Sequence, residues 1–261
     1  MARGSRVSNV ETLSIDPRLA GARLMLSKVK RIVLVMGSKG GVGKTLIATL
    51  LALQAARLGL RVGLLDLDVT GPSAHVVLGV DPRGVQPEER EGVVPPEVAR
   101  GLRFMSIVFY TWGRPTPLRG ESVDEVIKEV LAVTNWGELD LLVVDTPPGL
   151  RDETLDVLEY LPNPHVVAVT TPSKLAQAGV ERLLALLAEQ RVPRYLVENM
   201  ARNGGVAKQL AERYGAEYLG VVGYDPSVED AIGSIEKLLA TRVARDVERV
   251  TRSLLGKLGL A

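Results

Sequence analysis

The sequence predicts an α/β fold, a doubly wound and mostly parallel sheet with helices on both faces. Short apolar runs rich in β-branched residues alternate with longer Ala- and Leu-rich or amphipathic stretches over most of the 261 residues, which is the pattern of repeated βα units. Glycines or aspartates directly follow some of the apolar runs, at the strand ends where open α/β sheets bind ligands. Apolar residues make up 46% of the chain, enough for one large core.

The composition excludes several classes of protein. The chain contains no cysteine, which excludes disulfides, cysteine-bound zinc and a cysteine-held iron–sulfur cluster within it. No apolar run approaches the ~20 residues of a membrane span, and the amino terminus lacks an apolar signal core. A net charge of +1 gives no global reason for nucleic acid or a membrane surface as a partner. We therefore expect a cytoplasmic protein that has no transmembrane segment and does not bind nucleic acid.

The first 29 residues are expected to form a leader and an arm. Residues 1–15 show no periodicity, whereas Asp16-Pro17 is a start signal for a helix that runs to about Lys30. Residues 30–261 are then expected to form a single domain.

A strand, a glycine-rich loop and a helix follow the arm. The run Ile32–Met36 predicts a strand buried on both faces, and the run Leu46–Leu58 predicts a buried helix. Between them, Gly43-Lys44-Thr45 is typical of a phosphate-binding loop, in which loop amides and a helix terminus bind phosphate. Lys44 would reach the β- and γ-phosphates, and the Thr45 hydroxyl would bind Mg²⁺. The predicted nucleotide-binding residues here are Ser38, Lys39, Gly40, Gly41, Val42, Gly43, Lys44, Thr45 and Leu46.

Two further predicted strands end in carboxylates. The run Arg61–Asp68 closes with Asp68, and the run 140–145 closes with Asp145 before a Pro-Pro turn and Gly149. Asp145 would hold Mg²⁺ through a water, and the Gly149 N–H would contact the γ-phosphate. A carboxylate such as Asp68 beside a metal–phosphate centre can position or deprotonate a nucleophile. The predicted metal ligands are Thr45, Asp68 and Asp145.

The remaining elements continue the βα alternation. Residues 81–100 predict a loop or short hairpin, and residues 111–120 predict either a partner-facing loop or a simple connection. The other predicted strands and helices are strand Leu102–Val108, helix Val123–Val133, strand His165–Thr170, helix Ser173–Gln190, strand Arg194–Glu198, helix Gly205–Tyr214 and strand Tyr218–Val222.

An amphipathic helix is predicted over residues 235–256. Its apolar face carries Val243, Val247, Val250 and Leu254, and arginines line much of the other face. A basic amphipathic tail suggests membrane docking. Because acidic residues interrupt the charge and bulky aromatics are missing, docking onto the sheet is the better interpretation.

Several motifs resemble those of the Mrp/ApbC family of P-loop ATPases, which are relatives of MinD and ParA. The segment 39–45 is similar to the family's deviant phosphate loop, Asp66-x-Asp68-x-x-Gly-Pro-Ser73 to its first switch, and residues 145–153 to its second. Val197-Glu-Asn-Met200 resembles the adenine-reading segment. The resemblance covers about residues 30–230, and it implies a SIMIBI-like P-loop NTPase fold.

The resemblance also implies ligands and roles. It implies ATP and Mg²⁺ as cofactors and a slow, dimer-dependent ATPase whose two copies meet face to face. In that arrangement Lys39 crosses to the partner's phosphates and Asp68 orients the attacking water, so the implied catalytic residues are Asp68, Lys39 and Lys44. Asn199 would recognise the adenine edge, and the loop containing Pro226 and Val228 would cover the base.

The family is mostly associated with iron–sulfur clusters, held by a Cys-x-x-Cys pair soon after the adenine segment. Here residues 200–205 contain no cysteine. The resemblance therefore implies a homodimeric ATPase of cluster assembly or carriage that lacks its own ligands and works with a cysteine-bearing client or scaffold. Two alternatives stay open: a MinD/ParA-type spatial regulator with ATP-dependent membrane or DNA binding, and a kinase or ligase on the same scaffold.

Overall fold

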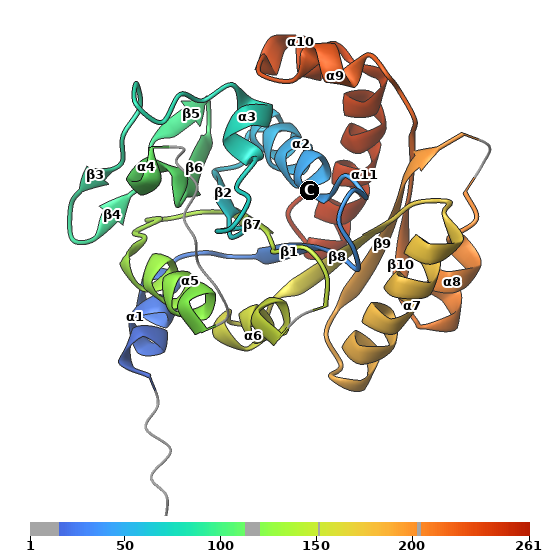
Figure 1. Ribbon diagram of the computed structural model, residues 1–261, viewed down its shortest axis with the longest axis horizontal. Coiled ribbons are helices and arrows are strands. Elements are labelled where there is room, and N and C mark those ends of the chain that lie inside the picture. The colour runs from blue at the N-terminus through green and yellow to red at the C-terminus, as the bar shows by residue number, and fades with distance from the viewer. Residues whose placement is uncertain (1–15, 113–120, 151, 203–204) are drawn as a thin grey trace, which may run out of the picture.

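The computed structural model describes residues 16–112, 121–150, 152–202 and 205–261 (Figure 1). An eight-stranded sheet has the order β10-β9-β8-β1-β7-β2-β6-β5. Its parallel strands are β1 (Ile32–Gly37), β2 (Val62–Asp66), β6 (Leu102–Ser106), β7 (Leu141–Asp145), β8 (His165–Thr170), β9 (Arg194–Ala201) and β10 (Glu217–Gly223). The short β5 (Glu97–Ala99) is antiparallel to β6. The doubly wound, mostly parallel sheet is therefore confirmed.

Helices cover both faces of this sheet (Figure 1). The helices α2 (Lys44–Arg57) and α11 (Arg242–Leu258) cover one face, and α5 (Glu121–Val133), α6 (Asp152–Tyr160), α7 (Lys174–Glu189) and α8 (Lys208–Arg213) lie on the other. Shorter elements connect them, namely α1 (Pro17–Met25), α3 (Ala74–Leu78), α4 (Val108–Thr111), α9 (Val228–Ala231), α10 (Ile235–Ala240), and the hairpin of β3 (Glu88–Glu89) with β4 (Val93–Val94).

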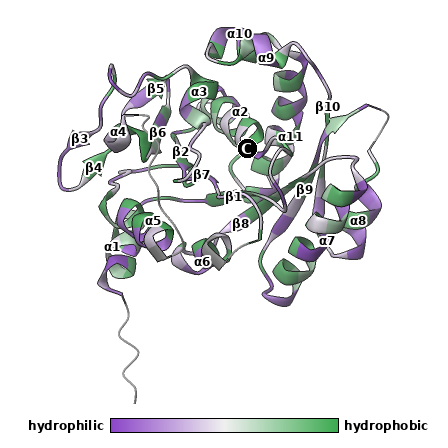
Figure 2. Ribbon diagram, in the orientation of Figure 1, coloured by the Kyte–Doolittle hydropathy of each residue, from purple (hydrophilic) through white to green (hydrophobic). Residues whose placement is uncertain are grey.

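The core lies along the central strands. Every residue of β1, β2 and β7 is buried, because helices cover both faces of these strands. Figure 2 shows hydrophobic residues on this part of the sheet and on the helix faces turned toward it. The strand β1 lies between β7 and β8, so the strands that follow it in the chain are placed on both of its sides. In open α/β sheets, ligands bind in a crevice at the carboxyl end of a strand in this position.

The predicted helix Gly205–Tyr214 begins only at Lys208, as α8, and two further predicted helices differ from the structure. The first ends at Met25 and not near Lys30, and α1 packs against α5. The predicted helix 235–256 is two helices, because Thr241 is extended (φ −67°, ψ 159°) and its hydroxyl accepts a hydrogen bond from the Ala244 N–H at 3.1 Å. A threonine in this geometry is an N-cap, which ends α10 and starts α11.

The apolar face of α11 packs against α2 and β10, as the sequence analysis favoured. Val243, Val247, Val250 and Leu254 are at most 3% exposed, whereas the arginines of the other face are exposed. This apolar face is therefore covered by the protein itself. Within the described residues, no helix combines the length and apolar character that a membrane span requires. The predicted loop 111–120 lies mostly outside the described residues.

Asp140, at the amino end of β7, offers a stability test far from the nucleotide edge. Its carboxylate accepts hydrogen bonds from the Arg61 guanidinium at 3.2 Å and from the Arg61 N–H at 2.9 Å, and it forms an ion pair with Lys30 at 2.8 Å. The Arg61 guanidinium, followed by Lys30, holds the pKa of Asp140 well below the usual range. Asp140→Asn is expected to reduce the free energy of unfolding at pH 7 by about 1 kcal/mol.

The pH dependence of that loss follows from the sign of the shift. A lowered pKa in the folded state gives the full stabilisation above the unfolded pKa of about 4. The difference between wild type and variant should therefore begin to shrink as the pH falls below that value, and it should vanish only below the much lower pKa of the folded state. Urea unfolding at several pH values measures it. Glu138→Gln is the matched control, because Glu138 meets the same arginine with a side chain that is 70% exposed. An equal effect in both variants would contradict the assignment.

Candidate functional site

The loop between β1 and α2 surrounds a cavity of about 300 Å³, here called the phosphate-loop cavity. Gly41 and Gly43 have φ values of +79° and +81°, in the left-handed region where glycine is favoured. These turns wrap the backbone around the cavity before α2 begins at Lys44. The cavity is lined by Lys39, Gly40, Gly41, Val42, Gly43, Lys44, Thr45, Leu46, Asp68 and Pro148.

The amino terminus of α2 adds positive potential to this cavity. No acidic residue lies in the first turn of this 14-residue helix, so the partial positive charge of its terminus is not compensated there. Free N–H groups at a helix start bind anions. The arrangement is suited to phosphate.

Two buried carboxylates stand side by side next to the loop. Strand register pairs Asp66 with Asp145, and both are almost fully buried. Asp145 forms an ion pair with Lys44, the buried loop lysine. Burial raises the pKa of Asp145, and burial together with the Asp145 charge raises the pKa of Asp66 to about 8. Lys44 therefore faces two buried carboxyl groups, Asp145 as its ion-pair partner and Asp66, whose ionisation is disfavoured.

This group of side chains fits a divalent cation. Among the described residues, the Asp145 Oδ2 atom is buried and has no hydrogen-bond partner. The Thr45 hydroxyl interacts with the Asp145 carboxyl group and accepts a hydrogen bond from the Ser73 hydroxyl at 3.4 Å. Carboxylate and hydroxyl oxygens are ligands that Mg²⁺ accepts, usually together with phosphate oxygens. The predicted ligands Thr45 and Asp145 are thus brought together.

Asp68 lies in the loop after β2, because the strand ends at Asp66 and not at Asp68 as predicted. It is half-buried and lines the phosphate-loop cavity. Its Oδ1 atom accepts hydrogen bonds from the Thr70 hydroxyl and the Gly71 N–H, each at 3.1 Å. These contacts hold the carboxylate at the cavity.

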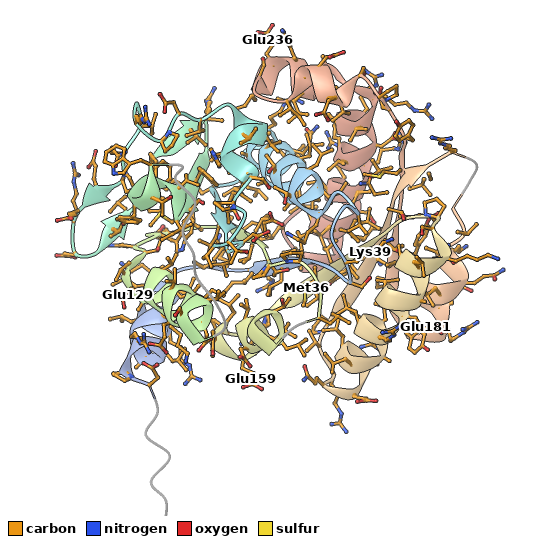
Figure 3. All side chains as sticks on the ribbon, viewed as in Figure 1. Met36, Lys39, Glu129, Glu159, Glu181 and Glu236 are labelled. Carbon is orange, nitrogen blue, oxygen red and sulfur yellow. The ribbon has the colours of Figure 1, made fainter. Side chains whose placement is uncertain are left out.

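Lys39 also lines the cavity and is half-buried. Figure 3 places it in the loop that joins β1 to α2. In the part of the chain that the structure describes, no carboxylate forms an ion pair with it. Its ammonium group therefore differs from that of Lys44, which Asp145 neutralises.

A second cavity of about 360 Å³, here called the Asn199 cavity, adjoins the loop through Leu46. The predicted residues Asn199, Pro226 and Val228 line it, together with Tyr224 and Ile232. The Asn199 Nδ2 group donates to the Val42 carbonyl at 2.9 Å. In this structure the amide therefore binds the phosphate loop, whereas the sequence predicted that it binds a base edge.

Two further predicted residues lie differently from expectation. The Ser38 hydroxyl contacts the Ala176 carbonyl of α7 at 3.5 Å, and Ser38 does not line the phosphate-loop cavity. The Gly149 N–H donates to the Gly37 carbonyl at 3.1 Å, so a γ-phosphate would have to displace that bond. Pro148 forms this part of the cavity wall.

Asp66, Tyr224 and Ile232 also lie at the site, although none of them has a role predicted from the sequence. The signal for Asp66 was its position at the end of a buried strand, two residues before Asp68. Tyr224 directly follows the last strand of the sheet, at the same edge. Ile232 carries no local signal, since only the packing of α9 places it at a cavity.

Comparison with known proteins matches the chain to one family. The model of the ParA family described as NUBPL iron-transfer P-loop NTPase matches residues 28–258. A cytosolic Fe-S cluster assembly factor Nubp2 homolog from Anopheles gambiae is 36% identical over 80% of this chain and 89% of its own length. An iron-sulfur cluster carrier protein from Aquifex aeolicus is 32% identical over 87% of this chain, which spans 66% of that relative.

Solved structures share the architecture. A nucleotide-binding protein from Archaeoglobus fulgidus in complex with ADP superposes with a TM-score of 0.68 at 30% identity, covering 89% of this chain and 92% of the other. The cell division ATPase MinD from Pyrococcus furiosus superposes with a TM-score of 0.64 at 18% identity, covering 87% of this chain and 99% of the other. At 18% identity, the similarity to MinD shows that the two proteins share a fold.

Proposed function

The chain belongs to the family of ParA-like NUBPL iron-transfer P-loop NTPases, and we propose that it is a Mg-ATP-dependent switch ATPase of iron–sulfur cluster assembly or carriage. The observation that supports this most is the phosphate-loop cavity. In it a glycine loop with left-handed turns, a carboxylate, and a lysine that forms no ion pair with any described residue meet. A glycine-rich βα turn that binds no ligand would need neither the Lys39 ammonium group nor the Asp68 carboxylate.

In the proposed site the loop amides and Lys44 bind the phosphates, and the Asn199 cavity takes the adenine. Pro226 and Val228 form one wall of that cavity, and Leu46 forms the boundary between base and phosphates. Thr45 and Asp145, with Asp68 near, would hold Mg²⁺, which supplies positive charge against the phosphate oxygens when bound.

Hydrolysis would be carried out by Asp68 and Lys39. Asp68 is held by the Gly71 N–H at 3.1 Å, so its carboxylate can orient the attacking water or accept its proton. Phosphoryl transfer spreads negative charge over the equatorial oxygens, and Lys39 from a second copy would stabilise it as an arginine finger does. Turnover would then be slow until a dimer forms.

The cargo is proposed to be handled without cysteine ligands from this chain, which has none. A cysteine-bearing client or scaffold would supply them, in the cytoplasm, as the names of relatives from Anopheles gambiae and Dictyostelium discoideum suggest. Anaerobic reconstitution with iron and sulfide, followed by visible absorption, tests the proposal that this chain does not hold a cluster by itself. We expect no stable cluster on the isolated chain, and a stable cluster would contradict the proposal.

Lys39→Ala is expected to abolish ATP-dependent dimerisation and to leave ADP binding within about threefold of wild type. The reason is that Lys39 is free of ion pairs in the described chain and would act on the partner's phosphates. Light scattering after gel filtration, with ATP, with ADP and without nucleotide, measures the mass. Exposed Lys174→Ala is the control. A dimer that persists in Lys39→Ala with ATP would refute the role in trans.

No specific observation on the described residues supports the alternative function, ATP-dependent binding to membrane or DNA. The apolar face of α11 that could dock on a membrane is buried against α2 and β10. Liposome flotation and a DNA mobility shift, each with and without ATP, would revive this alternative if either were positive.

A further inference from the structure

Two glycines join the Asn199 cavity to the first switch. Gly79 ends α3 with φ +70°, and Gly233 follows α9 with φ +88°. The Gly233 N–H donates to the Val77 carbonyl at 3.3 Å. A Cβ atom on Gly79 would lie 2.7 Å from the carbonyl carbon of Gly233. Only glycine therefore permits this close approach of two backbones.

The other end of α3 is attached to the phosphate side of the site. Asp66 accepts hydrogen bonds from the N–H groups of Ser73 and Ala74, each at 3.1 Å. The Ser73 hydroxyl reaches the Thr45 hydroxyl at 3.4 Å. The helix between these contacts has five residues, so it can transmit a displacement between its ends with little bending.

On the base side, Gly233 directly follows a wall of the Asn199 cavity. Val228 and Ile232 line that cavity, and they begin and follow α9. A shift of the Gly233 backbone therefore moves Ile232, its neighbour in the chain. Neither glycine lines the phosphate-loop cavity or the Asn199 cavity.

We infer that Gly79 and Gly233 are positioning residues for base recognition, and that their contact couples the Asn199 cavity to the first switch. This inference rests on the proposed function, which assigns the base to that cavity. A substitution at Gly79, at the end of α3 that faces α9, should weaken recognition of the base and leave recognition of the phosphates intact.

The test compares two alanine variants with the same backbone strain. Gly79 and Gly259 are both helix C-caps, with φ and ψ of 70° and 29° for the first and 69° and 34° for the second. A Cβ atom on Gly259 would meet nothing within 4 Å. Gly79→Ala therefore adds the clash and Gly259→Ala adds only the strain.

Calorimetry with Mg-ADP and with inorganic tripolyphosphate separates base from phosphate binding. We expect Gly79→Ala to weaken ADP binding at least about tenfold, in line with the cost of misplacing a recognition group, and to change tripolyphosphate binding less than about twofold. Gly259→Ala should match wild type for both. Wild-type affinity for ADP in Gly79→Ala, or equal losses for both ligands, would overturn the inference.

The two proposals fail in different ways. If the wild-type chain binds neither ligand, the proposed function fails and this inference falls with it. If Gly79→Ala does not fold, hydrogen exchange on the wild type decides. ADP should slow exchange in both 74–80 and 228–234 more than tripolyphosphate does, and equal exchange in 74–80 with the two ligands would overturn the coupling.

Discussion

Replacing Lys44 with alanine is expected to raise the dissociation constant for Mg-ADP at least about 100-fold, the largest binding effect of any single substitution in this chain. Unlike the half-buried Lys39, Lys44 lies buried against Asp145, and it is 7% exposed. A charge-assisted hydrogen bond to phosphate in a buried site with a low local dielectric contributes several times the binding free energy of one at the surface. Calorimetric titration measures the change.

The same substitution should also destabilise the fold, which has to be separated from the loss of binding. Without Lys44, the buried Asp145 loses its ion-pair partner, and such a loss costs about 3–5 kcal/mol. Asp145 can escape part of that cost by taking up a proton, since burial already raises its pKa. The destabilisation should therefore be smaller at pH 5 than at pH 8.

A double variant provides the control. Lys44→Ala with Asp145→Asn removes the uncompensated charge, so stability should recover in thermal unfolding while nucleotide binding stays lost. Lys39→Ala changes a lysine of the same loop that has no ion pair among the described residues, so this variant should keep wild-type stability. Nucleotide binding within tenfold of wild type in a folded Lys44→Ala would refute the phosphate role.

Asp68→Asn is expected to lower the rate of ATP hydrolysis at least about 100-fold, the usual contribution of a general base, while ATP binds within about threefold of wild type. Asparagine retains an oxygen that can accept from the Gly71 N–H, as Asp68 Oδ1 does at 3.1 Å. The substitution therefore preserves the turn and removes the charge. Single-turnover phosphate release and filter binding measure the two effects.

Thr70→Ala is the matched control for Asp68. It removes the hydroxyl that donates to Asp68 Oδ1 at 3.1 Å and keeps the carboxylate, so hydrolysis should stay within about threefold of wild type. An equal loss in both variants would show that the turn matters and the charge does not. Unchanged hydrolysis in Asp68→Asn would refute the catalytic role.

Short-range patterns were sufficient to predict the strands and the phosphate loop. The run Ile32–Met36 is fully buried as β1, because a β-branched run followed by glycines has few other stable conformations. Gly43-Lys44-Thr45 opens α2 as predicted, two residues earlier than the apolar run suggested. Helix ends did not follow from hydrophobic periodicity alone. The pattern over residues 235–256 predicts one helix, whereas the hydrogen bond from the Ala244 N–H to the Thr241 hydroxyl starts α11 within it.

Pairings between distant segments could not be read from such patterns. The neighbours Asp66 and Asp145 depend on strand order and register. The Lys44–Asp145 ion pair and the Asn199–Val42 hydrogen bond depend in addition on how α2 and β9 pack. The same holds for Gly79 and Gly233, where each glycine alone predicts only a turn.

The sequence by itself determined the alternation of strands and helices, the glycine loop with Lys44 and Thr45, and the carboxylates at strand ends, because local sterics and hydrophobic periodicity act over a few residues. The tertiary structure decided which of these groups meet, that Ser38 faces α7 and Asn199 faces the loop, and that the two cavities share a wall at Leu46. Those contacts arise from the packing of whole elements, and burial in that packing also sets the charges at the site.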